Sequence, residues 1–377
     1  MLKVLQLIPT LDRSGAEKQM VTLARGLPRD RFQVEAATLT RSGPLEAELT
    51  AAGVPVTGIT KRFKVDPSAL RRLTAFLKAG RFDVVQTWLF AANAYGRIAA
   101  RRAGAPVVVT AEMAVDLWKG PIERYVDRKL ATYSDKVVGN SHAVVDFYKR
   151  LGVPADRLEM IYSGIADEPP PKVDPAAVRA EIGFPGDAKL ALFVGRLAPQ
   201  KRVDDLLKVL DLLQHVQPDL RTAIVGDGPS RESLERLAVG LALTDKVRFL
   251  GHRDDVPRLM AAADVAVLPS AYEGLPNVVL EAMLQARPVV ATAAPGTTEV
   301  VVDGVTGVLA PVGDAPLLAR ALRDLVRDPD RGRALGEAGR ARVLAEFRAD
   351  AMVARFADLY ERLAAARGLN ATTAPTS

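Results

Sequence analysis

Short apolar runs of strand length alternate with amphipathic stretches of helix length along most of this chain of 377 residues. Several runs are apolar at consecutive positions, which is typical of strands that are covered on both faces. This alternation predicts parallel sheets with right-handed crossovers. In the first half the expected strands are residues 4–8, 34–39, 54–59, 84–88, 106–110, 136–140 and 158–163.

The alternation breaks once, at an acidic pair that is followed by three prolines, Pro169 to Pro171. Neither a helix nor a strand continues through such a sequence, so we expect an interdomain linker at about residues 165–187. Strand candidates then resume at residues 190–195, 220–226, 247–251, 265–270, 287–292 and 307–312. The sequence from 316 to 367 is predicted to be helical, and residues 367–377 are predicted to form a disordered tail.

The chain is therefore predicted to be an α/β protein of two Rossmann-like, doubly wound domains, residues 1–168 and 169–349. Ligands of open parallel sheets bind beyond the carboxyl ends of the strands. If the two sheets face each other, their carboxyl-end loops line one deep cleft. The residues that directly follow each strand are therefore the candidates for chemistry.

Composition excludes several classes of protein. The chain has no cysteine, so disulfides and thiolate metal sites are ruled out. No apolar run approaches the roughly 20 residues of a membrane span. The only early run, residues 4–8, is too short for a signal-peptide core. These features predict a cytoplasmic protein.

Positive charge is concentrated in the first half. Residues 1–168 carry 25 lysines and arginines against 18 acidic residues, whereas the remainder carries 26 against 27. A basic patch at residues 61–81 consists of Lys61, Arg62, Lys64, Arg71, Arg72, Lys78 and Arg81. Such a patch can face an anionic membrane surface or a phosphorylated acceptor, or it can be a solvated helix face. It lacks interleaved aromatic residues, so we expect no nucleic-acid partner.

One candidate loop follows the expected strand 190–195 and carries Gly195, Arg196, Leu197 and Lys201. Glycine lets the backbone approach a ligand, and the two cations suit phosphate oxygens. A diphosphate leaving group needs such neutralisation as negative charge builds on it. The alternative is a pair of solvated cations ahead of a helix.

A second candidate loop follows the expected strand 265–270. Glu273 and Gly274 lie in the loop, and Pro276 suits the first turn of a helix that continues through Met283. The free amides at the start of that helix can bind phosphate. Glu281 lies within the helix on an otherwise apolar segment, where it either binds the diol of a ribose or forms an ion pair with a neighbouring basic side chain.

Together the two loops resemble the donor-binding region of the retaining glycosyltransferases of family 4, which have the two-domain GT-B fold. The family hallmark is a pair of glutamates separated by seven residues, here Glu273 and Glu281, and its companion is the segment of Gly195, Arg196 and Lys201. The resemblance covers residues 190–312. It implies that the final helix, about 350–366, packs back on the first domain.

The resemblance also implies the site. Donor-binding residues would be Gly15, Gly195, Arg196, Lys201, Gly228, His252, Arg253, Glu273, Gly274, Leu275, Asn277, Val278 and Glu281, with catalytic roles for Arg196, Lys201 and Glu273. Glu281 would hold the ribose and Glu273 the sugar. No metal and no cofactor is expected, because the basic residues neutralise the leaving diphosphate.

The first half matches the family less closely. Many relatives place a histidine or arginine after the strand that here precedes Glu112, and no histidine of this chain lies there. The candidates for contact with the acceptor are Glu112, Trp88 and Asn140. Asn140 and Ser141 are also candidates for capping the following helix.

The implied reaction is retaining transfer of a sugar from a UDP- or GDP-linked donor to a glycan or lipid-linked acceptor, in the synthesis of cell-envelope polysaccharide or glycolipid. Two alternatives stay open. The same fold serves nucleotide-sugar 2-epimerases, which form product without an acceptor. A non-catalytic protein that binds nucleotide sugars is the other.

Overall fold

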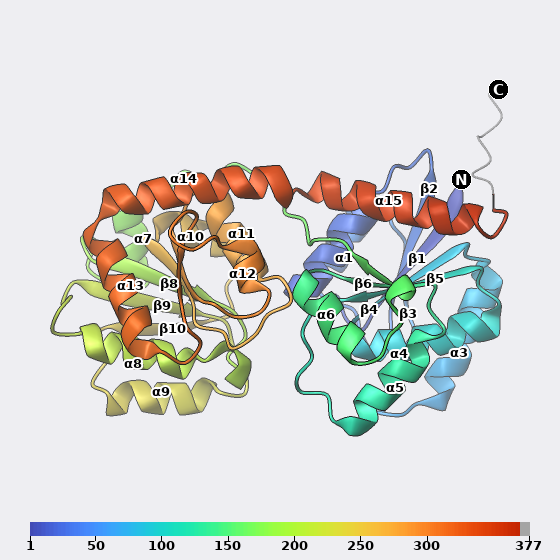
Figure 1. Cartoon of the computed structure of the whole chain (residues 1–377), viewed down its shortest axis with the longest axis horizontal. Helices are drawn as coiled ribbons and strands as arrows, with labels where there is room; N and C mark the ends of the chain where they lie inside the picture. Colours follow the sequence, from blue (N-terminus) through green and yellow to red (C-terminus); the bar gives the residue numbers. More distant parts are fainter. Residues whose placement is uncertain (370–377) are drawn as a thin grey trace. The chain divides into compact units, whose positions relative to one another are not determined.

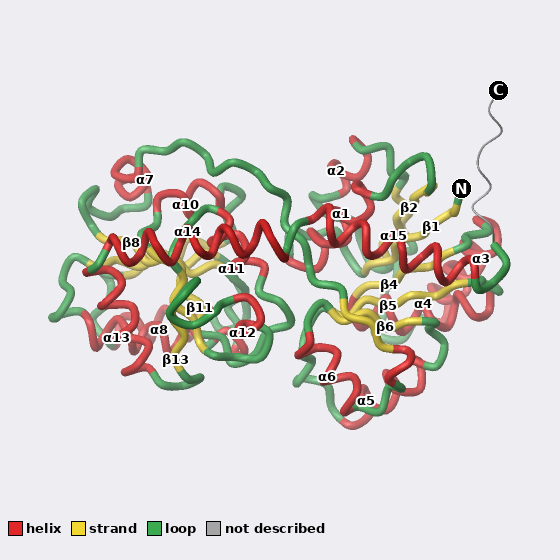
Figure 2. Tube along the Cα trace, turned by 45° about the horizontal axis from the view of Figure 1, so that its top comes forward, coloured by secondary structure: helices red, strands yellow, loops and turns green. Residues whose placement is uncertain are grey.

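The computed structural model describes residues 1–369 and divides the chain into two compact units (Figure 1). Unit 1 comprises Met1–Ala166 and the described residues from Ala349 onward, and unit 2 comprises Asp167–Arg348. In each unit, helices flank a central sheet (Figure 2). Both units are thus built from layers of helix and parallel strand, and the structure confirms the predicted α/β class.

The sheet of unit 1 has seven parallel strands in the order β3-β2-β1-β4-β5-β6-β7. The strands are β1 (Leu2–Ile8), β2 (Phe32–Thr38), β3 (Val56–Gly58), β4 (Val84–Trp88), β5 (Val107–Glu112), β6 (Lys136–Gly139) and β7 (Leu158–Met160). Every residue of β4 and β5 is buried, as continuous apolar runs predict for strands covered on both faces.

The helices of unit 1 are α1 (Gly15–Gly26), α2 (Glu46–Ala51), α3 (Pro67–Gly80), α4 (Leu89–Ala103), α5 (Pro121–Ala131), α6 (His142–Arg150) and α15 (Ala349–Ala365). Side chains cap the amino ends of two of these helices. The Asp66 carboxylate accepts from the Ala69 amide at the start of α3, and the Ser141 hydroxyl accepts from the Val144 amide at the start of α6. Of the two capping candidates, Ser141 is therefore the one that caps α6.

Helix α15 belongs to unit 1 although it lies near the end of the chain. It packs beside α1, and its Tyr360 hydroxyl bonds both Gln6 in β1 and Gln86 in β4 (Figure 1). The Phe356 ring packs at 6.1 Å from the ring of Trp88. The side chains of α15 thus form part of the same apolar core as β1 and β4.

The sheet of unit 2 has six parallel strands in the order β10-β9-β8-β11-β12-β13. They are β8 (Lys189–Val194), β9 (Leu220–Val225), β10 (Val247–Gly251), β11 (Val265–Leu268), β12 (Val289–Thr292) and β13 (Val308–Ala310). The helices are α7 (Pro175–Glu181), α8 (Val203–Leu213), α9 (Arg231–Gly240), α10 (Val256–Ala262), α11 (Asn277–Leu284), α12 (Thr297–Val300), α13 (Ala315–Arg327) and α14 (Pro329–Glu346).

All thirteen expected strands are present, but three other expectations are met only in part. The expected linker contains α7, which Asp174 caps and which packs on α10 inside unit 2. The expected helical region 316–367 consists of three helices, with interruptions at Asp328 and again before Ala349. Residues 367–369 are held by backbone hydrogen bonds to the last turn of α15, so only residues 370–377 of the expected tail lie outside the described residues.

Across residues 1–369, the structure contains no helix with both the length and the apolar composition that crossing a bilayer requires.

Candidate active site

The strand order of unit 2 reverses between β8 and β11. In open parallel sheets, ligands bind at the carboxyl ends of the strands that flank such a reversal. The segment that follows β8 contains Arg196 and Lys201, and the segment that follows β11 contains Glu273. The two loops singled out in the sequence therefore leave the sheet from adjacent strands.

An ion pair joins these two loops. The Lys201 Nζ lies 2.6 Å from Glu273 Oε1, and the two side chains are 16% and 8% exposed. Gln200 adds two hydrogen bonds between the loops. Its side-chain Nε2 donates to the backbone carbonyl of Tyr272 at 2.7 Å, and its backbone carbonyl accepts from the Ala271 amide at 2.8 Å. The ammonium and the carboxylate are thus held in a largely water-excluded place, where charge acts more strongly than at a surface.

Two glycines allow the loop after β9 to lie against the loop after β8. Gly226 has a φ of +126°, and a Cβ there would stand 2.0 Å from the Gly195 carbonyl oxygen. A Cβ at Gly228 would stand 2.4 Å from the Leu197 carbonyl oxygen. The backbone of the predicted phosphate loop is therefore set by contacts that no other residue permits.

Helix α11 begins beside Glu273. Pro276 precedes its first turn, which contains Asn277 and Val278, and both of these residues are half-buried. Glu281 is also half-buried, one turn further along the helix. The positive end of this helix dipole thus lies within four residues of the Lys201–Glu273 pair, an arrangement that suits a phosphate group.

The remaining donor candidates differ in what they contact. Gly274 and Leu275 are buried between Glu273 and α11, whereas Arg196 and His252 are exposed at the carboxyl ends of β8 and β10. Arg253 is engaged elsewhere. Its Nε and Nη2 donate to Asp255 at 2.7 and 2.8 Å, and its Nη2 also contacts Glu181 in α7 at 3.2 Å. Arg253 is thus engaged with Asp255 and Glu181, and its assignment to donor binding stays a prediction.

In unit 1 the strand order reverses between β1 and β4, and the loop after β1 leads to Gly15. Gly15 is exposed at the first position of α1. Sequence reasoning did not single out Glu17, which is buried and accepts hydrogen bonds from the hydroxyls of Thr10 and Ser14. Burial raises the pKa of the Glu17 carboxyl above its usual value. An acidic residue in the first turn of a helix after a central strand was the signal available for it.

The three acceptor candidates lie at the carboxyl ends of neighbouring strands, but all three are buried. Trp88 is 1% exposed and donates its indole N–H to Gln6 at 2.7 Å. Glu112 is 2% exposed and pairs with Arg97 at 3.3 Å. Asn140 is 3% exposed, and its Oδ1 has no hydrogen-bond partner within residues 1–369. The structure does not support direct acceptor contact by Trp88 or Glu112, whose polar atoms have internal partners.

Glu112 belongs to a buried cluster of ionisable side chains that sequence reasoning missed. The cluster consists of Arg97, Glu112, Asp116, Lys119, Asp127 and Tyr148. The Asp127 carboxylate bonds both cations, at 2.7 Å from Arg97 and 2.6 Å from Lys119. An acidic residue in place of the family's usual histidine or arginine is thus explained by the two buried cations beside it.

Burial raises the pKa of the Glu112 carboxyl from its usual 4.5 to about 7. The cluster contains three carboxyls and only two cations. Asp127 takes the short contacts to both cations, while Glu112 keeps one longer contact to Arg97. Glu112 is therefore the carboxyl that is most easily protonated.

This pKa predicts how the stability of unit 1 depends on pH. Because the pKa of Glu112 is higher in the folded state than in the unfolded state, proton binding by Glu112 stabilises the fold. This contribution is fully present below pH 4.5 and is lost as the pH rises through 7. Between pH 5 and pH 8 the free energy of unfolding should fall by about 1–3 kcal/mol. In Glu112→Gln this fall should be largely abolished, as urea denaturation at the two pH values can measure. Glu48→Gln, on the surface of α2, is the control, and an equal flattening there would contradict the assignment to Glu112.

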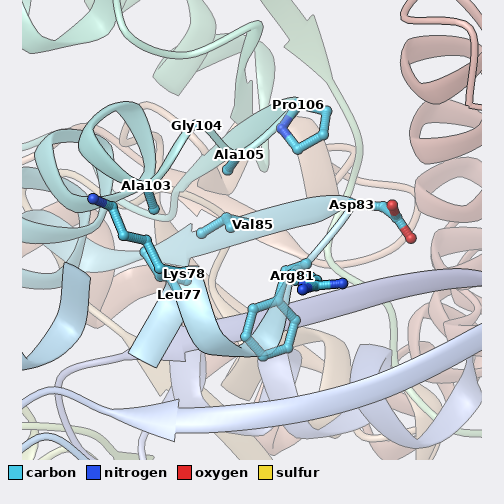
Figure 3. A pocket seen from close by; sticks show the side chains of 10 residues that line it. Leu77, Lys78, Arg81, Asp83, Val85, Ala103, Gly104, Ala105 and Pro106 are labelled. Atoms are coloured by element: carbon cyan, nitrogen blue, oxygen red, sulfur yellow. The ribbon is translucent and has the colours of Figure 1, made fainter. Parts of the chain in front are cut away.

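A cavity of about 290 Å³ lies at the opposite edge of the unit 1 sheet. Figure 3 shows its lining, with Lys78 at one side and Asp83 at the other. Asp83 and Pro106 precede β4 and β5, so the cavity lies at the amino ends of these strands. It is thus separate from the carboxyl-end residues described above.

The sequence of this chain matches glycosyltransferases along most of its length. The family model "Glycosyl transferases group 1" matches residues 175–342, and "Glycosyltransferase Family 4" matches residues 13–168. A D-inositol 3-phosphate glycosyltransferase of Streptomyces coelicolor is 31% identical, over 93% of this chain and 87% of its own length. An enzyme of the same name from Thermobispora bispora is 30% identical, over 92% of this chain and 85% of its own length.

Solved structures show the same fold. HepE of Anabaena, crystallised with UDP-glucose, superposes with a TM-score of 0.86 at 24% identity and covers 95% of this chain and 99% of its own. Sucrose-phosphate synthase of Thermosynechococcus elongatus has a TM-score of 0.84 at 22% identity, with coverage of 97% and 100%. Both confirm the predicted GT-B fold.

The sequence match extends over almost the whole chain and the fold is that of GT-B enzymes, so the chain belongs to glycosyltransferase family 4.

Proposed function

We propose that this glycosyltransferase moves a sugar from a UDP-linked donor to a glycan or lipid-linked acceptor, with retention at the anomeric carbon. The observation that carries the proposal is the Lys201–Glu273 pair at the strand-order reversal of unit 2, beside the positive end of α11. HepE was crystallised with UDP and with UDP-glucose, which supports a uridine donor rather than a guanosine donor here.

The residues divide the work by their chemistry. Arg196 and Lys201 neutralise the leaving diphosphate together with the first-turn amides of α11. Glu273 binds hydroxyls of the transferred sugar, and Glu281 binds the ribose. With that charge supplied by side chains, we propose that the reaction needs no metal ion and no cofactor.

Retention follows if the leaving diphosphate deprotonates the acceptor on the same face of the sugar. The protein then holds the reacting groups in geometry and stabilises the departing phosphate, which are the two effects that the site is built to supply. The relatives from Streptomyces coelicolor and Thermobispora bispora carry D-inositol 3-phosphate in their names, so we propose this compound as a first acceptor to test.

For the membrane, we propose that the basic patch at residues 61–81 faces anionic lipid at the inner surface of the cell membrane. An aromatic residue, which sequence reasoning missed, does lie between cations of the patch: Phe63 follows Arg62 and precedes Lys64. Phe63 and Val65 are 70% and 77% exposed. Cations interleaved with exposed apolar side chains suit a charged lipid surface. This placement fits a role in the synthesis of cell-envelope polysaccharide or glycolipid.

Donor binding is the first test of the proposed function. UDP-glucose at 100 times its Kd should stabilise the protein by about 2.7 kcal/mol, seen as a rise in Tm, and GDP-glucose should have a smaller effect. NMR of the product should show the anomeric configuration of the donor, and EDTA should leave turnover unchanged. An inverted product, or epimer formed from the donor alone, would replace this proposal by another activity of the same fold.

A further inference from the structure

Two aromatic rings meet at the carboxyl edge of the unit 1 sheet. Phe90 follows β4 and Trp118 follows β5, the neighbouring strand. Their ring centroids are 5.6 Å apart, and their planes cross at 89° in an edge-to-face contact. Trp118 is 59% exposed, unlike the buried Trp88. Ligands of parallel sheets bind at this edge, so an exposed indole here lies where a substrate is expected.

The backbone that presents Phe90 is strained. Leu89, the first residue of α4, has a φ of +65°, a value in the left-handed region that non-glycine residues rarely adopt. Such strain persists where the surrounding structure enforces it, and it clusters at functional sites. The turn places the ring of Phe90 at the second residue of α4.

The residue next to Trp118 is a buried lysine, Lys119, whose side chain is held by several polar contacts. The Lys119 ammonium lies 2.6 Å from each of Asp116 Oδ2, Asp127 Oδ2 and the Tyr148 hydroxyl, and its side chain is fully buried. It also lies 4.9 Å from the centre of the Phe90 ring. Burial of an ammonium carries a large desolvation cost, which the two ion pairs and the hydrogen bond offset while they tie this loop to Asp127 in α5 and Tyr148 in α6.

The segment that follows Trp118 in the chain, and the residue before it, expose further apolar side chains. Leu117 is 50% exposed, and Ile122 and Tyr125 at the start of α5 are 76% and 55% exposed. The indole N–H donates to Asp116 Oδ1 at 3.1 Å, which leaves the ring as the part of Trp118 that can meet a partner. Grouped exposed apolar side chains mark binding sites more often than single ones do.

We propose that Trp118 packs against a sugar ring of a glycan acceptor and thereby helps to select it, with Lys119 and Phe90 as positioning residues. The apolar C–H face of a sugar suits an indole ring. A ring held by a buried ion cluster and an edge contact suits a ligand of defined shape, whereas a fluid lipid surface needs no such precision. This inference rests on the proposed transfer to an acceptor and adds the acceptor's class and a contact residue.

The test uses the full chain, UDP and a glycan array. Wild-type protein should bind a subset of the glycans, and Trp118→Ala should weaken that binding about 10-fold or more. Trp118→Phe should keep binding within about threefold, because it retains an aromatic face. The chain has two tryptophans, and Trp88 is buried, so titration with the bound glycan should change the emission of Trp118.

Lys119→Met should reduce glycan affinity while the Kd for UDP-glucose stays unchanged. Both are measured at a temperature at which urea denaturation, followed by tryptophan fluorescence, shows unit 1 of the variant to be folded, so that unfolding of unit 1 does not account for the loss. Leu212→Ala, a half-exposed leucine on α8 of unit 2, is the matched control and should bind as wild type does.

Equal glycan binding by Trp118→Ala, or no glycan binding by wild type that binds UDP-glucose, would overturn the inference. Loss of binding to phosphatidylglycerol vesicles in Trp118→Ala with glycan affinity unchanged would assign the surface to lipid instead. Failure of the wild type to bind any UDP-sugar would count against the proposed function itself.

Discussion

Lys201→Ala is expected to lower kcat about 100- to 1000-fold with UDP-glucose as donor, since removal of one preorganised charge contact to a developing anion has effects of this size. Lys201 is held 2.6 Å from Glu273 and is mostly shielded from water. The substitution removes the cation that neutralises the leaving diphosphate and leaves the Glu273 carboxylate without this partner. Both effects act on the transition state more than on ground-state binding, so KM for the donor should change less than kcat.

Lys208→Ala provides the control for charge alone. Lys208 lies on α8, just after the same loop, its side chain is 51% exposed, and it pairs with Asp204 and Asp205. Its removal should leave kcat within twofold of wild type. Arg196→Ala should behave as Lys201→Ala does, because Arg196 lies in the same segment after β8 and its side chain is exposed there. A loss below threefold in Lys201→Ala would remove Lys201 from the catalytic assignment.

Arg97→Met is expected to destabilise unit 1 by about 3–5 kcal/mol, the usual cost of removing one partner from a buried ion pair. Arg97 is 1% exposed, and its guanidinium contacts Asp127 at 2.7 Å and Glu112 at 3.3 Å. Methionine fills a similar volume but leaves both carboxylates buried with less compensation. Urea denaturation followed by tryptophan fluorescence can measure this loss, because Trp88 and Trp118 both lie in unit 1.

Arg102→Met is the matched control, since Arg102 lies on the same helix with its side chain exposed. That variant should stay within about 0.5 kcal/mol of wild type, as surface substitutions usually do. If the two variants were equally stable, the buried cluster would not be a determinant of the stability of unit 1.

The fold was readable from the sequence because parallel strands covered on both faces are continuous apolar runs. The stretches 190–194 and 265–268 show this most clearly, and β4 and β10 have the bounds that were expected. The loops of unit 2 were readable for a related reason. Lys201 and Glu273 each lie in the segment that follows a strand, and adjacent strands bring these segments together.

The interior of unit 1 was not readable in this way. Arg97 and Lys119 look like surface cations, because the partners that bury them lie far along the chain or on another element, as Asp127 does 30 residues beyond Arg97. Burial of Glu112 depends on those partners in turn. The contact of Arg253 with Glu181 was unreadable for the same reason, since it spans 72 residues. Local pattern reports the backbone well, but ion pairs between distant elements depend on the finished packing.

The Ala349 amide donates to the Ile165 carbonyl at 2.9 Å, so the chain leaves unit 1 and re-enters it at neighbouring points. On the ribosome, residues 1–166 emerge first, but Phe356 and Tyr360 cannot cover Trp88 and Gln86 until all of unit 2 has been made. Domains usually fold in the order of their synthesis. Here unit 2 is synthesised completely before unit 1 is, so the core of nascent unit 1 stays incompletely covered until α15 has been made. A chain that ends before α15 would leave unit 1 in that incompletely folded state.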